Sequence, residues 1–270
     1  MIVLAAFPFA LCAQWPAYPT AGVPKTATGA PNLTAPAPRT FDGKPNLSGI
    51  WRNSQPVRLG AFGEGAPQRN PADPPTGLDQ FRDIGIDFKD GLPLQPWAAE
   101  LKKQRMASFS KDNPDAHCLP MGNMQFMTHP QPRKIVQTPD LIVILYEAND
   151  GIRQIFLDGR PLPNNDPDPW WYGYSIGKWD GDTLVVETTG FRPEGWLDIN
   201  GSPLTEAAKI TERFRRVDYG HLEITISVDD PKAYTKPWTV TVRQTIELDT
   251  QMIEFICAEN EKDVRHMQGK

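Results

Sequence analysis

From about residue 130 onward the chain divides into short apolar and β-branched runs bounded by turn-forming residues, and this pattern constrains the fold most. About nine of these runs predict β-strands, at residues 135–136, 141–146, 152–157, 172–179, 183–188, 209–217, 222–228, 238–248 and 252–257. The turn signals Asn149-Asp150-Gly151, Asp180-Gly181 and Tyr219-Gly220 are typical of hairpins. No crossover helix of a dozen residues intervenes, so neighbouring strands are expected to pair antiparallel.

A meander of this length would leave two unpaired edges unless the sheet closes or splits. We therefore predict a mainly β fold, in which an antiparallel meander closes into a lipocalin-like barrel; a β-sandwich is the alternative. One short helix is expected from Pro96 to Ala107, because proline is favoured in a first helical turn.

Three segments are expected along the chain. Residues 1–13 are apolar, uncharged from residue 2 onward and end in small residues, which predicts a signal peptide cleaved near Ala13 and a periplasmic or secreted protein. Residues 14–50 form a Pro-rich arm in which Pro24-Lys25-Thr26 recurs 14 positions later as Pro38-Arg39-Thr40. The arm lacks apolar periodicity, so it is expected to run extended over the surface or to act as a tether. Residues 51–270 are expected to form one β-rich domain, with an irregular and partly helical lead-in to about residue 130.

Charge and composition exclude several kinds of partner. The net charge is −5, and the basic runs at 102–105 and 213–216 are short and interrupted, so nucleic acid is not an expected partner. No later stretch reaches the length of apolar chain that spans a membrane. Phosphate-cradling glycine loops, a serine elbow, zinc-protease patterns and EF-hand loops are also missing from the sequence, and no cofactor is expected.

Removal of the signal peptide would remove Cys12 and leave Cys118 and Cys257, which we predict to form a disulfide in an oxidising compartment. A metal site built from His117, Cys118 and His266 is disfavoured, because adjacent residues seldom bind one ion. Met121, Met124, Met127 and His129 have the composition of a soft copper site, but methionines at this spacing more often fill a core. No metal is expected.

Several motifs together resemble one family. They are T-F-D-G-K-P-N-L-S-G-I-W at 40–51, Q-T-P-D at 137–140, W-D-G-D-T-L-V-V at 179–186, T-E-R-F at 211–214 and C-A-E-N at 257–260. This set resembles a family of uncharacterised secreted bacterial proteins that begin with D-G-K-P-x-L-S-G-x-W. The resemblance covers nearly the whole mature chain and implies export and a single domain, but it brings no established activity. Relatives often carry histidines near Gly201 and just before the Glu-Arg pair, and this chain has none at either place.

Strand alternation places polar side chains on apolar faces. In the run 209–217, Ile210, Glu212 and Phe214 share one face, and in the run 238–248 Gln244 lies among apolar residues. A buried carboxylate must be paired or face a cavity. Glu212 is therefore expected either to pair with Arg213 or Arg216 or to serve as a pocket acid with a raised pKa.

Aromatic residues suggest a ligand surface. In the run 171–179, Trp171 and Trp179 share a face with Gly173, Ser175 and Gly177, opposite Tyr174. Small residues between two indoles predict a concave strip suited to a flat apolar ligand or a sugar ring. The alternative is that the glycines admit a neighbouring backbone.

The long loop 190–208 is the third candidate, because long loops in a meander are often functional lids. It carries Arg192, Glu194, Trp196, Asp198 and Asn200. Asp198 is a possible acid/base partner for Glu212.

Three functions are compatible with these patterns. The leading hypothesis is an exported protein that binds a small molecule or carbohydrate in a barrel pocket lined by Trp171, Tyr174, Trp179, Trp196, Glu212 and Gln244. The first alternative is a hydrolase or lyase that uses Glu212 as general acid/base, with Asp198 or Arg213 assisting. The second is an envelope interaction protein whose arm adds to a partner's sheet. The sequence leaves the ligand and the oligomeric state open.

Overall fold

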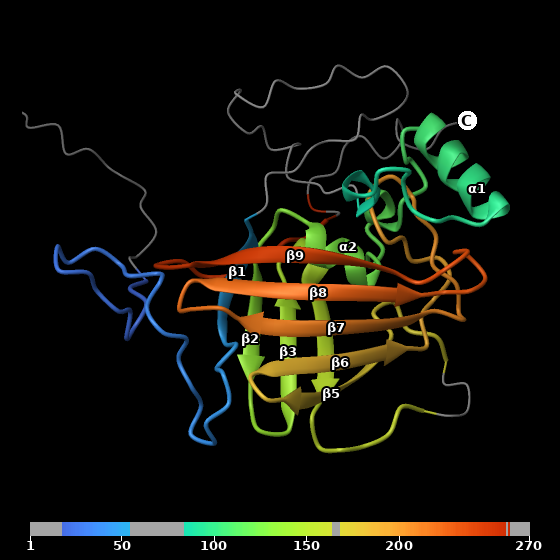
Figure 1. The fold of residues 1–270 in the computed structure, drawn as a ribbon. Helices are drawn as coiled ribbons and strands as arrows, with labels where there is room; N and C mark the ends of the chain where they lie inside the picture. Colours follow the sequence, from blue (N-terminus) through green and yellow to red (C-terminus); the bar gives the residue numbers. More distant parts are fainter. Residues whose placement is uncertain (1–17, 55–83, 164–167, 258, 260–270) are drawn as a thin grey trace, which may run out of the picture.

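A computed structural model describes residues 18–54, 84–163, 168–257 and 259. Its nine strands form one closed barrel in sequence order, which confirms the predicted mainly β, lipocalin-like barrel (Figure 1). The strands are β1 Gly49–Asn53, β2 Arg133–Gln137, β3 Leu141–Tyr146, β4 Gly151–Phe156, β5 Tyr174–Asp180, β6 Thr183–Thr189, β7 Lys209–Arg216, β8 His221–Asp229 and β9 Trp238–Glu247. The predicted signal peptide lies outside the described residues.

Helices occupy little of the described chain. The predicted helix is confirmed as α1, Pro96–Ala107, and a shorter α2 spans Asn123–Thr128. Single 3-10 turns form η2 Ile84–Asp87, η3 Pro114–His117 and η4 Ala148–Asp150. Over the described ranges, no helix is long and apolar enough to cross a membrane.

Two sequence predictions about strands were wrong. Residues 252–257 do not form a strand, whereas Gly49–Asn53, which we expected to be the end of the arm and the start of the domain, forms β1. β1 pairs antiparallel with both β2 and β9 and thereby closes the barrel. Because β1 takes the free edge of β9, the barrel has no edge left for a strand at 252–257.

The purely antiparallel prediction fails at one junction. β4 and β5 pair in parallel over the short register Ile155↔Ser175 and Phe156↔Ile176. The described parts of the connecting segment, residues 157–163 and 168–173, form no helix. The parallel pairing means that the two strands run in the same direction, opposite to what a hairpin gives. β4 and β5 therefore share only a short paired stretch, and the chain around Trp171 lies before β5 rather than within it.

The core fills the barrel and extends to both sides of it. Alternate residues of β7, β8 and β9 are buried, as the period-2 pattern predicts. Trp51 is fully buried and donates from Nε1 to the Leu47 carbonyl at 3.0 Å. Met121, Met124 and Met127 belong to the same apolar cluster, as expected of core methionines. The arm and α1 lie on opposite sides of the barrel (Figure 1).

Candidate functional site: an indole-walled cleft outside the barrel

The barrel interior contains a buried ion pair. Arg153 of β4 donates from Nη1 to Glu212 Oε1 of β7 at 3.0 Å, and its Nη2 also contacts the carboxylate. Both side chains are 1 % exposed. The same guanidinium donates to the hydroxyls of Ser175 and Thr188 at 3.1 and 3.0 Å, so it bridges four strands. Burial opposes the charge on Arg153, but the Glu212 carboxylate outweighs burial and raises the arginine pKa above its ordinary value.

The expected partners of Glu212 were wrong. Arg213 lies on the outer face of β7 and pairs with Asp180 at 2.9 Å. Arg216 is buried, and its Nη1 and Nη2 donate to backbone carbonyls, including that of Tyr219. Strand alternation explains the first error, since successive residues point to opposite faces. Arg153, the actual partner, belongs to a strand far away in sequence.

The other predicted polar residues lie apart from this pair. Gln244 is 1 % exposed, next to Leu222 and Asn53 in register, and neither amide atom has a hydrogen-bond partner among the described residues. Asp198 is fully buried in its own loop, where it accepts hydrogen bonds from the Ser202 backbone and hydroxyl at 3.0 and 2.6 Å. The structure thus gives Asp198 and Glu212 separate sets of partners.

A cleft of about 790 Å³ lies beside the barrel, between α1, the segment 112–119 and the loop 190–208. It contains two of the predicted ligand-binding residues, Trp171 and Trp196. Other lining residues include Leu101, Gln104, Arg105, Ser108, Asp112, Pro114, His117, Leu119, Arg192 and Glu194. Sequence reasoning did not connect α1 or residues 112–119 with the two indoles, because only the tertiary fold brings these segments together.

An arginine guanidinium lies over each indole ring of the cleft. Arg105 lies over the Trp196 ring, 4.4 Å from its centroid, and Arg192 lies 5.5 Å from the Trp171 centroid. Both distances are within the range of cation–π attraction. Burial lowers the pKa of Arg105, with smaller opposing contributions from Asp198 and Asp112. The cleft therefore combines flat apolar walls with fixed positive charge.

The loop 190–208, which was considered as a functional lid, packs as one wall of the cleft. Trp196 is 2 % exposed and forms a backbone bridge with Pro203. Gly122 approaches this wall so closely that an added Cβ would lie 2.4 Å from the Trp196 carbonyl oxygen. Such packing fixes the Trp196 side of the cleft.

The predicted strip from Trp171 to Trp179 was wrong. Trp171 precedes β5, and Trp179 lines a different cavity, of about 730 Å³, with Leu157, Arg160 and Lys178. An added Cβ on Gly177 would lie 2.6 Å from the Leu157 side chain. Glycine at this position therefore lets the Leu157 side chain pack closely against β5.

Tyr174 lies apart from both tryptophans of the cleft. Its ring stacks on Phe156 with the centroids 5.3 Å apart, and Trp170 meets it edge-on at 5.9 Å. Its hydroxyl accepts from Arg160 at 3.2 Å. The six residues expected to share one pocket are thus distributed over several places.

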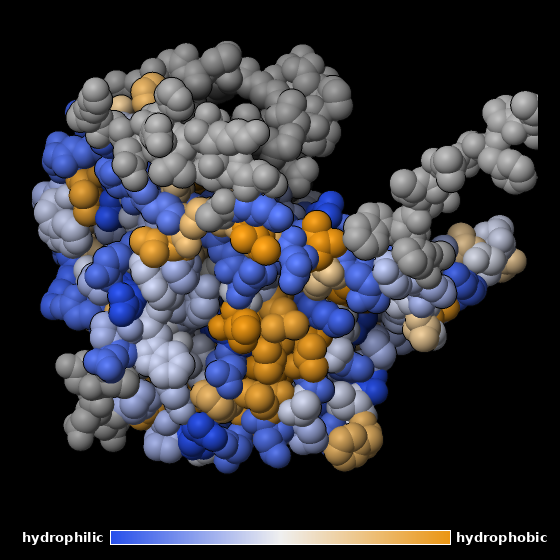
Figure 2. All heavy atoms as spheres, turned by 180° about the vertical axis from the view of Figure 1, so that it is seen from behind, coloured by the Kyte–Doolittle hydropathy of each residue, from blue (hydrophilic) through white to orange (hydrophobic). Residues whose placement is uncertain are grey.

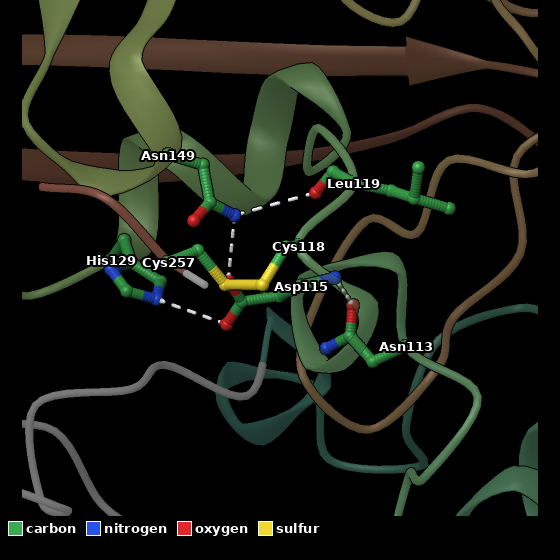
Figure 3. The surroundings of a disulfide bond; sticks show 7 residues. All are labelled: Asn113, Asp115, Cys118, Leu119, His129, Asn149 and Cys257. Carbon is green, nitrogen blue, oxygen red and sulfur yellow. Dashed lines mark hydrogen bonds and ion pairs between the residues drawn. A yellow bond between two sulfur atoms is a disulfide. The ribbon is translucent and has the colours of Figure 1, made fainter. Parts of the chain in front are cut away.

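The predicted disulfide between Cys118 and Cys257 is confirmed, with the Cα atoms 5.5 Å apart (Figure 3). Beside it, Asp115 accepts a hydrogen bond from Asn149 at 2.8 Å and lies 3.8 Å from His129 Nε2. Burial opposes ionisation of Asp115, but the interactions with His129 and Asn149 outweigh it and lower the carboxyl pKa. Because Pro114, His117 and Leu119 line the cleft, the disulfide also holds one wall of it.

No group of three or more His, Cys, Asp or Glu side chains in the described chain is arranged to hold a metal ion, and His266 lies outside that part.

Apolar side chains gather over the outer face of β2–β4 (Figure 2), where Val136 is 40 % and Ile152 59 % exposed.

No protein-family model and no curated protein matches this chain. The family resemblance of the D-G-K-P motif accordingly remains a prediction. Because a fold alone does not imply a function, the residues of the cleft are the basis of the functional proposal.

Proposed function

We propose that this protein is exported and binds a small, partly apolar ligand in the cleft outside the barrel. The observation that carries the proposal is that Trp171 and Trp196 both line one cavity of about 790 Å³. Small-molecule sites are clefts of roughly 300–1,000 Å³ with mostly apolar walls and a few fixed polar groups. This position replaces the barrel interior of the leading sequence hypothesis.

Export is supported by the disulfide together with the predicted signal peptide. Disulfides persist in oxidising compartments and are rare in the cytosol. Cys118 and Cys257 are joined in the structure, and Cys12 belongs to the segment expected to be removed.

The interior carboxylate gives less support to an enzyme. A general acid has to reach a substrate proton, either directly or through one water molecule. Glu212 is 1 % exposed and its carboxylate is engaged by Arg153, so the ion pair accounts for its burial. The residues of the cleft, by contrast, form a surface suited to binding.

Calorimetric titration of the mature protein tests the proposal with three probes: 2-naphthoate, 2-naphthamide and methyl glucoside. At least one naphthyl probe should bind, and Trp171→Ala should weaken that binding about tenfold, since one lost aromatic contact together with its buried area is worth about 1.4 kcal/mol. Binding of the glucoside alone would assign the cleft to carbohydrate instead of an aryl ligand.

Trp170→Ala is the matched control. Trp170 adjoins Trp171 in sequence and is 45 % exposed, but it does not line the cleft. Its loss should change the affinity by less than about twofold. Equal losses in the two variants, or no binding of any probe, would refute the proposal.

A further inference from the structure

The cleft differs from the rest of the described protein in how its arginines are partnered. Most described arginines outside it reach a carboxylate; these pairs are Arg39–Asp182, Arg52–Glu247, Arg153–Glu212, Arg160–Asp158, Arg213–Asp180, Arg215–Glu223 and Arg243–Glu223. Arg133 and Arg216 instead direct their terminal nitrogens to backbone carbonyls. The two arginines of the cleft, Arg105 and Arg192, belong to none of these ion pairs, and each donates to only one backbone carbonyl.

Each cleft arginine is oriented by a single backbone carbonyl. Arg105 donates from Nη1 to the Gly201 carbonyl at 2.8 Å, and Arg192 donates from Nε to the Pro169 carbonyl at 3.1 Å. Within the described ranges, neither guanidinium forms an ion pair with a carboxylate. A guanidinium carries five N–H donors, so each fork retains donors for a ligand. The attraction between each guanidinium and the indole ring beneath it further restricts the position of each fork.

Resting on the proposed function, we infer that the ligand of this cleft is a planar organic acid with one oxyanion group, a carboxylate or sulfonate. Its ring packs against the apolar wall, and its oxyanion accepts hydrogen bonds from Arg105 and Arg192. Charge-assisted bonds between an arginine fork and an oxyanion are the strong and directional ones.

The apolar part of the wall supports the ring. Leu101, Leu119 and Trp171 line the same cavity as the arginines, and Leu119 is 46 % exposed. A flat ring placed here would remove this side chain from water, and the burial of apolar area favours binding.

The acids of the cleft limit the ligand to one negative charge. Asp112 and Glu194 line it too, and both are exposed. A ligand with a second anionic group would bring that group towards these carboxylates and would be repelled. The arrangement therefore selects a monoanion over both a neutral analogue and a dianion.

The test compares three probes with one ring system on the mature protein: 2-naphthoate, the neutral 2-naphthamide and naphthalene-2,6-dicarboxylate. Naphthoate should bind at least tenfold more tightly than the amide, because hydrogen bonds from an arginine to a charged group are stronger than those to a neutral one. The dicarboxylate should bind more weakly than naphthoate, and Glu194→Gln should reduce that difference.

Arg192→Gln should lower the affinity for naphthoate more than the affinity for naphthamide and so reduce the preference for the acid, because only the acid loses a charge-assisted hydrogen bond. Arg192 is the better target, because Arg105 also packs against Gly201, where an added Cβ would lie 2.6 Å from the Arg105 side chain. Arg213→Gln, which removes an exposed arginine on the outer face of β7, is the control and should leave all affinities unchanged.

The outcomes separate the two proposals. Equal affinities for naphthoate and naphthamide, both lost in Trp171→Ala, would overturn the anion inference and leave the proposed function standing. A preference for naphthoate that is undiminished in Arg192→Gln would also overturn the inference. If none of the probes bound to the protein, both proposals would be refuted.

Discussion

At the scale of single residues, the Glu212–Arg153 pair places two opposite charges inside an otherwise largely apolar barrel. Strand alternation predicts that Glu212 lies among apolar neighbours, and the structure agrees. Alternation does not reveal the partner, because Arg153 lies 59 positions away in sequence and meets Glu212 only in the closed barrel. An isolated buried carboxylate would be costly, whereas a bidentate partner with two further hydroxyl contacts makes the charge tolerable.

Arg153→Met tests this account. Removing one partner of a buried ion pair leaves an uncompensated charge, so the free energy of unfolding should fall by about 3–5 kcal/mol. The double variant Arg153→Met/Glu212→Leu should recover much of this loss, since neither charge remains. Urea denaturation measures both variants.

Arg213→Ala is the control for the same measurement. It removes the exposed Asp180–Arg213 pair and should cost no more than about 1 kcal/mol. If Arg153→Met were equally mild, the interior pair would not be a structural determinant.

The arm is the element whose role the sequence left open. It was expected to run over the surface or to act as a tether, and its described part packs on the barrel. The Gly220 amide donates to the Leu33 carbonyl at 2.7 Å, and the Tyr219 amide donates to the Ala35 carbonyl at 2.8 Å. Leu33 also packs against the apolar cluster. The absence of an internal apolar period therefore shows only that the arm has no core of its own.

Deletion of residues 14–37 should lower the melting temperature by about 5–10 °C. The deletion removes two backbone hydrogen bonds and the Leu33 contact, which together contribute about 2–3 kcal/mol. Leu33→Ala should act in the same direction with a smaller shift, and exposed Lys25→Ala should have no effect. Differential scanning calorimetry measures the three proteins, and an unchanged melting temperature after deletion would make the arm a tether.

At the scale of the whole molecule, the disulfide joins parts that the barrel does not connect. Cys118 follows η3 in the lead-in, and Cys257 ends a segment that lies beyond β9 without regular structure. The bond closes a loop with a sequence separation of 139. For a loop of this size, the chain-entropy model assigns about 5 kcal/mol of stabilisation before strain is subtracted.

Reduction should therefore loosen residues 113–129 and 251–257 before it affects the barrel strands. The strands are held by their own ladder, whereas residues 251–257 form no strand or helix and are joined to the lead-in by the disulfide, with a hydrogen bond from the Ile253 amide to Glu147 at 3.2 Å. Hydrogen exchange of the reduced and alkylated protein, with the oxidised protein as control, measures the local loss of protection. Simultaneous loss over β2–β9 would contradict this order of unfolding.

The sequence by itself determined which residues form most of the strands, which side of each strand is buried and which cysteines pair. These properties follow from local periodicity, turn residues and an even cysteine count, which need no knowledge of distant contacts. Only the tertiary structure decided that β1 closes the barrel, that Arg153 neutralises Glu212, and that Trp171, Trp196, Arg105 and Arg192 line one cleft. Each of these depends on segments far apart in the chain, and no local pattern records which of them become neighbours when the barrel closes.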